Sequence, residues 1–218
     1  MPSVLYLADR GSPAFEAGRT TVDVVCAGDS ITGWNNFGAV TEWPYRTYPD
    51  FLQRLSEPLG LALANGGIAG EVSGNGLGQV RDYLGLFPNA RYFVVGYGTN
   101  DLGMWPDVER TSPQVIGNLN GMVRAIVEGG RRPILLNVPP ANGSMFPRPA
   151  AEELRSHRAF HNERLEAYCR HCGVPLVDLS TALHDEHFGD ELHPNDHGAR
   201  IIALQVFQML GEVAGLTP

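Results

Sequence analysis

Two short polar segments of this sequence contain residue types that together could carry out nucleophilic catalysis. The segment Gly28-Asp29-Ser30 places a serine directly after an apolar run, and Asp190 and His193 lie three residues apart near the C-terminus. A serine hydroxyl attacks well only when a base takes its proton, and a histidine base works best when a carboxylate fixes its tautomer. We therefore expect Ser30, His193 and Asp190 to form a catalytic triad.

Such a triad also needs hydrogen-bond donors where negative charge develops during the reaction. The backbone N–H of Ser30 is one candidate, because it lies at the start of a turn. Gly70 is a second candidate, since a backbone without a side chain can be approached closely. The side-chain amide of Asn100 is a third, because it is an uncharged donor that does not compete with histidine for protons. Three donors of this kind would suit a tetrahedral acyl intermediate.

The elements that must position these residues can be predicted from the hydrophobic pattern. Five short apolar runs have the length and composition of β-strands, namely residues 22–27, 61–64, 92–97, 133–138 and 174–179. Helical spacing follows at residues 45–59, 112–129 and 150–172 and after Pro194, with Ser112-Pro113 expected to open its helix as N-cap and first residue. This alternation predicts a parallel sheet with helices on both faces.

The candidate catalytic residues follow the ends of these predicted strands. In parallel α/β sheets the functional crevice lies beyond the carboxyl ends of the strands, near the point where the strand order reverses. Ser30, Gly70 and Asn100 follow the first three runs, and Asp190 and His193 follow the fifth, so all should face one rim. We expect a single domain over residues 1–218. Residues 1–20 fall outside the alternation and should form a short edge strand or a wrapping arm.

These segments also carry a resemblance to a known family. GDSIT near the start, N-x-x-x-x-G in the second loop, GTND in the third and D-x-x-H-P near the end resemble the SGNH (GDSL) hydrolase superfamily, in order and in spacing. The resemblance implies a flavodoxin-like three-layer α/β/α sandwich with a five-stranded parallel sheet. It also implies an esterase or acylhydrolase activity, with Ser30 as nucleophile and Asp190 and His193 completing the triad.

The same resemblance chooses between two glycines of the second loop. The family glycine lies five residues after the asparagine of that segment, here Asn65, which selects Gly70 over Gly67 and pairs it with Asn100 in the oxyanion hole. Position 32 is threonine, so the G-x-S-x-G elbow of α/β-hydrolases is absent and that fold is not indicated. Asp29 and Asp101 border these motifs and should hold the loops by hydrogen bonds.

Composition and charge exclude several other classes. The formal net charge is −8, and all 16 basic residues are arginine without a basic stripe, which disfavours binding to nucleic acid or to an anionic membrane. No apolar stretch approaches the ~20 residues that a membrane span needs. Three cysteines, an odd number, argue against a disulfide scaffold. The N-terminus lacks a secretory pattern, which favours a cytoplasmic location, although a mature secreted fragment would look the same.

Two binding interpretations compete with catalysis in parts of the chain. His184 and His187, with His193 and His197 nearby, have the short spacing of zinc ligands, but His193 fits the triad better. The glycine-rich stretch at residues 65–78 could cradle a phosphate, yet it follows the second strand and lacks the G-x-G-x-x-G spacing. We therefore expect neither a metal nor another cofactor.

Aromatic residues near the expected rim are candidates for contacts with the substrate. We assign Trp34, Trp105 and Phe146 to substrate binding, whereas Trp43 before Pro44 should open a helix and pack in the core. Aromatic rings suit sugars, acyl groups and aryl groups alike. The small size of the domain favours a short-chain carboxylic ester, such as an acetyl group on a carbohydrate. A lysophospholipase or thioesterase activity, or an inactive ligand-binding module, remain alternatives, and the sequence does not indicate an oligomeric state.

Overall fold

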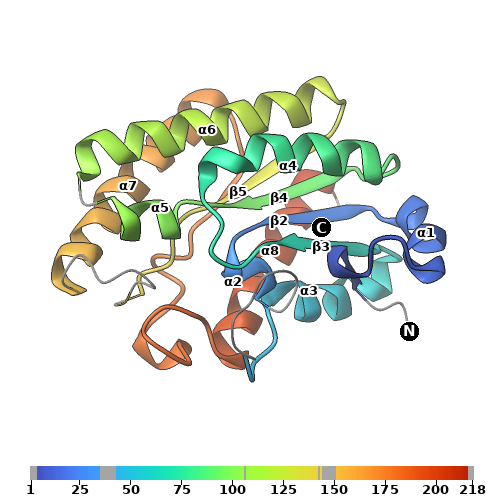
Figure 1. Cartoon of the computed structure of the whole chain (residues 1–218), viewed down its shortest axis with the longest axis horizontal. Coiled ribbons are helices and arrows are strands. Elements are labelled where there is room, and N and C mark those ends of the chain that lie inside the picture. Colours follow the sequence, from blue (N-terminus) through green and yellow to red (C-terminus); the bar gives the residue numbers. More distant parts are fainter. Residues whose placement is uncertain (1–3, 35–42, 106, 142, 144–150, 216–218) are drawn as a thin grey trace.

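The computed structural model describes residues 4–34, 43–105, 107–141, 143 and 151–215 (Figure 1). Its strands are β1 (Leu5–Tyr6), β2 (Val24–Gly28), β3 (Leu63–Gly67), β4 (Tyr92–Gly96), β5 (Arg132–Leu136) and β6 (Leu176–Val177). Its α-helices are α1 (Pro13–Gly18), α2 (Ser30–Gly33), α3 (Tyr48–Ser56), α4 (Ser73–Leu86), α5 (Thr99–Met104), α6 (Val108–Glu128), α7 (Ala151–Cys172) and α8 (Asp196–Ala214). Short 3₁₀ turns lie at Leu7–Asp9, Arg19–Thr21, Glu57–Leu59 and Asp185–His187.

The strands form one parallel sheet in the order β1-β3-β2-β4-β5-β6. Without the two-residue strand β1, the order is that of a flavodoxin-like sheet, in which the first strand lies between the second and the third. The predicted five-stranded sheet is therefore present, with one strand more at its edge. That strand, β1, comes from the N-terminal segment and pairs with β3.

Helices cover both faces of the sheet and give three layers (Figure 1). On one face α4, α6 and α7 pack over the sheet, with α1 near the β1 edge. On the other face α3 and α8 pack together beneath β2 and β3, with α2 beside them. The expected α/β/α sandwich is confirmed, and its fold places the carboxyl ends of β2, β3 and β4 side by side.

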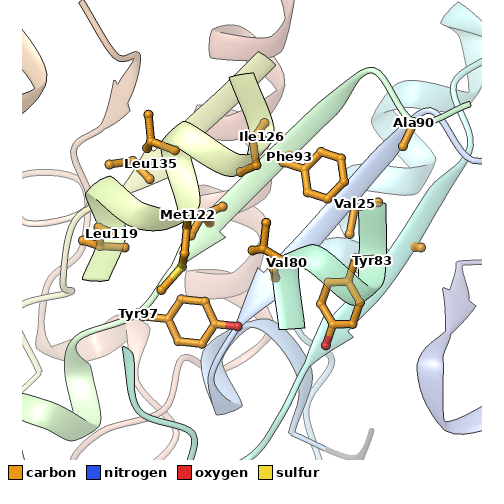
Figure 2. Close-up of a cluster of buried hydrophobic side chains, with 14 of the residues drawn as sticks. Val25, Val80, Tyr83, Ala90, Phe93, Tyr97, Leu119, Met122, Ile126 and Leu135 are labelled. Carbon is orange, nitrogen blue, oxygen red and sulfur yellow. The ribbon is translucent and has the colours of Figure 1, made fainter. Parts of the chain in front are cut away.

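The central strands are apolar on both faces because each face is covered by helices. Successive residues of β2 alternate between the two layers: Val25 and Ala27 pack in the cluster under α4 and α6, and Val24 and Cys26 in the cluster under α3 and α8. Figure 2 shows the first cluster, in which Phe93 lies among aliphatic and aromatic side chains of the covering helices. This packing fixes the strand ends that carry the polar loops.

Phe93→Ala is expected to lower the free energy of unfolding by about 3–5 kcal/mol, since it leaves a cavity in this fully buried cluster. Urea unfolding followed by circular dichroism measures the change. Leu204→Ala is a suitable control because Leu204 is 45% exposed on α8 and should cost far less. Equal losses in the two variants would contradict the assignment of Phe93 to the core.

Two helix starts differ from the sequence-based expectation. Helix α6 begins at Val108, where Asp107 caps it by accepting a hydrogen bond from the Arg110 N–H at 3.1 Å, so Pro113 lies inside the helix. Ser112 is fully buried and its hydroxyl pairs with His161 instead of capping a terminus. Helix α3 begins at Tyr48, three residues later than expected.

None of the helices in the described ranges combines the length and the apolar character that crossing a membrane requires.

Candidate active site

The candidate catalytic residues gather where the strand order reverses. Ser30 follows β2 directly, and Asn100 lies in α5, which begins just after β4. Because β2 pairs with β4 on one side and with β3 on the other, these segments and the loop after β3 share one end of the sheet. This is the position at which open α/β sheets bind their ligands.

Ser30 is held at the first position of the four-residue helix α2. The side chain of Asp29 caps this helix and accepts a hydrogen bond from the Ile31 N–H at 3.0 Å. The end of β3 packs so closely against α2 that a Cβ on Gly67 would lie 2.3 Å from the nitrogen of Gly33. The backbone under the serine is therefore fixed from two sides.

A continuous hydrogen-bonded chain joins the three predicted triad residues. The Ser30 hydroxyl lies 2.9 Å from Nε2 of His193, and Nδ1 of the same ring lies 2.9 Å from a carboxylate oxygen of Asp190. Ser30 and His193 are each 3% exposed, whereas the side chain of Asp190 is 43% exposed. With the proton on Nδ1, the ring can accept the serine proton at Nε2.

The turn that carries His193 is built around the carboxylate of Asp190. One oxygen accepts the backbone N–H groups of Leu192 and His193, at 2.7 and 2.5 Å, while the other faces the imidazole. The Gly189 N–H donates to the His193 carbonyl at 2.8 Å, and Phe188 forms a bridge with Pro194. Burial by itself would raise the pKa of Asp190, but these hydrogen bonds bring it below its ordinary value. The carboxylate is thus held in its ionised form.

Two indole rings pack against the imidazole. Trp34 lies edge-on to His193 with ring centroids 4.2 Å apart. The ring centroid of Trp43 lies 5.3 Å from that of His193. Trp43 was expected to open a helix and pack in the core. Instead it lies before the start of α3 and packs against the His193 ring, because the turn around Gly189 packs against Trp43 and Tyr45. Its only sequence signal is its position in the aromatic run between the first motif and α3.

The expected oxyanion donors lie in the loops after β2, β3 and β4. Gly70 adopts a left-handed backbone with φ of +76°, which favours glycine at this turn. Asn100 is 2% exposed, and its amide donates to the Glu71 carbonyl at 2.8 Å. That bond sets the direction of the amide and leaves its second N–H for a ligand. Neither Ser30 nor Gly70 donates its backbone N–H to another of the described residues.

A further carboxylate ties two of these loops together. Asp101 accepts hydrogen bonds from both the backbone N–H and the hydroxyl of Ser73, at 2.9 and 2.6 Å, at the first residue of α4. The segment between β3 and α4, which includes Gly70, is therefore joined to the segment that carries Asn100. The expectation that Asp29 and Asp101 hold loops agrees with these contacts.

Asn100→Ala is expected to lower kcat for an ester substrate by about 10²–10³-fold, because one oxyanion donor is typically worth that much. The value of KM should change little, since the donor acts mainly on the charge of the intermediate. Steady-state kinetics on p-nitrophenyl acetate measure both, with the exposed Asn89→Ala as control. A rise in KM at unchanged kcat would contradict the assigned role.

Asp29 is a fully buried carboxyl next to Ser30. Burial raises its pKa from 3.8 to about 6, against the opposing hydrogen bond from Ile31 and the nearby His193. The folded protein thus holds this proton more tightly than the unfolded chain. The resulting stabilisation is complete below the ordinary pKa and is lost as the pH rises through about 6.

Asp29→Asn is therefore expected to raise the free energy of unfolding at about pH 8 by about 2–3 kcal/mol, as each pKa unit corresponds to about 1.4 kcal/mol. The difference should vanish at about pH 4, where the native carboxyl is protonated. Urea unfolding at the two pH values tests this, with the exposed Asp82→Asn as control. A variant that is less stable than the wild type at the higher pH would show that ionised Asp29 is stabilising overall.

The residues predicted to bind substrate, and the histidines considered as metal ligands, have different surroundings. Trp34 contacts the imidazole of His193, Trp105 follows α5 with 44% of its surface exposed, and Phe146 lies outside the described residues. His187 packs edge-on against His197 with centroids 4.7 Å apart. Across the part of the chain that the structure describes, no three His, Cys, Asp or Glu side chains gather so as to hold a metal ion.

Comparisons with known proteins give the same picture of fold and family. The model of the GDSL-like lipase/acylhydrolase family matches residues 26–201. A GDSL-like lipase from Bacteroides thetaiotaomicron is 23% identical, with a TM-score of 0.68 over 95% of this chain and 98% of that one. No curated protein gives a significant match.

Two esterases have similar folds at lower identity. A carbohydrate acetylesterase from Sinorhizobium meliloti has a TM-score of 0.69 and the aryl esterase of M. smegmatis one of 0.72. Each is 16% identical and aligns over 90% of this chain and 100% of its own. At this identity the likeness shows the fold alone.

Proposed function

The chain belongs to the GDSL-like lipase/acylhydrolase family, and from this membership we propose that it is a serine esterase that removes short acyl groups from alcohols. The observation that carries the proposal is the hydrogen-bonded chain from Ser30 through His193 to Asp190. It lies at the rim where α/β enzymes of this topology bind substrates.

In the proposed reaction Ser30 attacks the ester carbonyl while Nε2 of His193 takes the hydroxyl proton. The carbonyl oxygen becomes negative and is stabilised by the N–H groups of Ser30 and Gly70 and by the amide of Asn100. His193 then gives its proton to the leaving alcohol, and the acyl group stays on Ser30. Water, activated by the same ring, attacks the acyl-enzyme and releases the acid. Activity should fall at acidic pH, where a protonated imidazole cannot act as a base.

The surroundings of the nucleophile favour a small acyl group. Ser30 is almost completely covered, and the rings of Trp34 and Trp43 occupy the space around His193. A long acyl chain would have to displace these side chains, whereas an acetyl group is small enough for a confined site. The folds of a carbohydrate acetylesterase and an aryl esterase are compatible with an acetyl ester of a sugar or of another small alcohol as substrate.

Hydrolysis of p-nitrophenyl acetate, butyrate and octanoate tests the proposal. We expect the highest kcat/KM with the acetate and a steep fall toward the octanoate. A profile rising with chain length would favour a lipase-like or lysophospholipase substrate instead. No hydrolysis of any ester, together with no labelling of Ser30 by a fluorophosphonate, would overturn the esterase proposal in favour of a binding module.

A further inference from the structure

An arginine buried in α7 donates to the loop after β5. Arg158 is 1% exposed, and its two terminal nitrogens donate to the carbonyls of Ala141 and Gly143, the latter at 2.8 Å. Its Nε has no hydrogen-bond partner in the described part of the chain. Burial lowers the pKa of this guanidinium to about 10, against the opposing charge of Asp29. The guanidinium is therefore shielded from solvent at a cost in desolvation free energy, and its hydrogen bonds go to backbone carbonyls.

The loop that Arg158 holds touches the turn carrying the catalytic acid. The N–H of Gly143 donates to the carbonyl of Glu191 at 2.6 Å, and Glu191 directly follows Asp190. A Cβ on Gly143 would lie 2.3 Å from the Cβ of Glu191, so only glycine allows this approach. A short path of contacts thus leads from Arg158 through Gly143 and Glu191 to Asp190.

The next turn of α7 fixes the start of the same loop. The side chain of Asn162 donates to the Val138 carbonyl at 2.8 Å and accepts the Val138 N–H at 3.0 Å. Asn162 and Arg158 are four residues apart and so lie on one face of the helix. Side chains of α7 therefore hold Val138, Ala141 and Gly143, the described residues of this loop that they contact.

Arginine is the residue type suited to this task. Its planar guanidinium presents donors in a fixed fork and can hold two carbonyls at once, whereas the ammonium of lysine is a single point. Arg158 pairs with no carboxylate among the described residues, and burying such a cation is unfavourable, whereas a methionine would fill the same space without that cost. Burial of Arg158 at this cost is explained if the position of the loop after β5 is important for the candidate active site.

We propose that Arg158 is a positioning residue, which holds the backbone of Ala141 and Gly143, the latter against Glu191, and thereby sets the orientation of Asp190 and His193 toward Ser30. The inference rests on the proposed esterase function for its kinetic consequence. Its structural part concerns the geometry of the Asp190–His193 pair and can be measured without turnover.

Two variants break the path at different points. Arg158→Lys keeps the charge but loses the fork, and Gly143→Ala leaves Arg158 intact but forces Glu191 away. Each should lower kcat for p-nitrophenyl acetate by about 10- to 100-fold, because a displacement of about 1 Å at a catalytic group has effects of this size. KM should stay within about 2-fold. The double variant should be no less active than the less active of the two single variants, since both interrupt the same path of contacts.

A spectroscopic measurement reports the geometry itself. The proton between Nδ1 of His193 and Asp190 should give a far-downfield ¹H resonance, assigned by its loss in His193→Gln. The resonance should shift or broaden in both variants and persist in Arg155→Met, the matched control at an exposed arginine one turn earlier. Full activity in Arg158→Lys would overturn the proposal, as would additive losses in the double variant.

Two further outcomes separate this inference from the proposed function. A lower melting temperature with unchanged kcat and an unchanged resonance would reduce Arg158 to a purely structural role and overturn the inference. A wild type that hydrolyses no ester, while the resonance responds to both variants, would overturn the esterase proposal and support the positioning role.

Discussion

Ser30→Ala is expected to lower kcat/KM for p-nitrophenyl acetate by about 10⁵-fold while leaving the fold unchanged. The hydroxyl of Ser30 is the atom that would form the acyl-enzyme, and it lies 2.9 Å from the proposed base. Removing one oxygen from a small buried side chain at a helix start leaves the packing of α2 intact. Steady-state kinetics measure the change in kcat/KM, and circular dichroism verifies that the variant is folded.

The control for this experiment is a serine outside the site. Ser156→Ala removes a hydroxyl from the exposed face of α7 and should leave the rate unchanged. The oxyanion donors remain in the Ser30 variant, so a small residual rate above the uncatalysed reaction is expected. A variant that retains more than about a hundredth of the wild-type rate would contradict Ser30 as nucleophile, given the losses seen for triad serines.

Asp190→Asn is expected to lower kcat by about 10⁴-fold with little change in KM. The carboxylate accepts three N–H groups, two from the backbone of the turn and one from the imidazole of His193. An asparagine whose oxygen serves the backbone donors must turn its NH₂ toward Nδ1. The ring would then carry its proton on Nε2, where it cannot accept the proton of Ser30.

The pH profile distinguishes this explanation from a loss of structure. Because its hydrogen bonds hold the pKa of Asp190 below the ordinary value, its carboxylate stays ionised while a histidine takes up a proton. The acid limb of the wild-type profile should therefore not arise from Asp190. The exposed Glu186→Gln is the control in the same segment. If Asp190→Asn kept the wild-type kcat, another group would have to orient His193.

The sheet could be predicted from the sequence because its strands have a local signature, and the meeting of Asp190 and His193 could be expected for the same reason. Apolar runs of strand length alternate with helical segments, and Asp190 and His193 lie close enough to meet within one turn. The helix α4 was not anticipated, since its four glycines give it a poor intrinsic helix propensity. It forms because Asp101 binds Ser73 at its first residue and because α6 packs against it.

Other features depend on contacts between distant segments. Trp43 preceded a proline and a helical pattern, and nothing local showed that the turn around Gly189 would bring it to His193. Arg158 sits in a helix of alternating charge, where an exposed position would be the usual interpretation. Only the packed structure shows that it is among the most buried side chains and that it contacts the loop after β5.

The proposed nucleophile Ser30 and the proposed base His193 are 163 positions apart in the chain, and this separation has a consequence for the timing of the proposed activity. During synthesis the N-terminal strands emerge first, so Ser30 leaves the ribosome long before His193 exists. A nascent chain therefore carries a serine with no general base, and it cannot attack esters in its surroundings. In the proposed esterase, catalysis becomes possible only when the turn at Asp190 docks onto the finished sheet, so ester hydrolysis would be a sensitive reporter of complete folding.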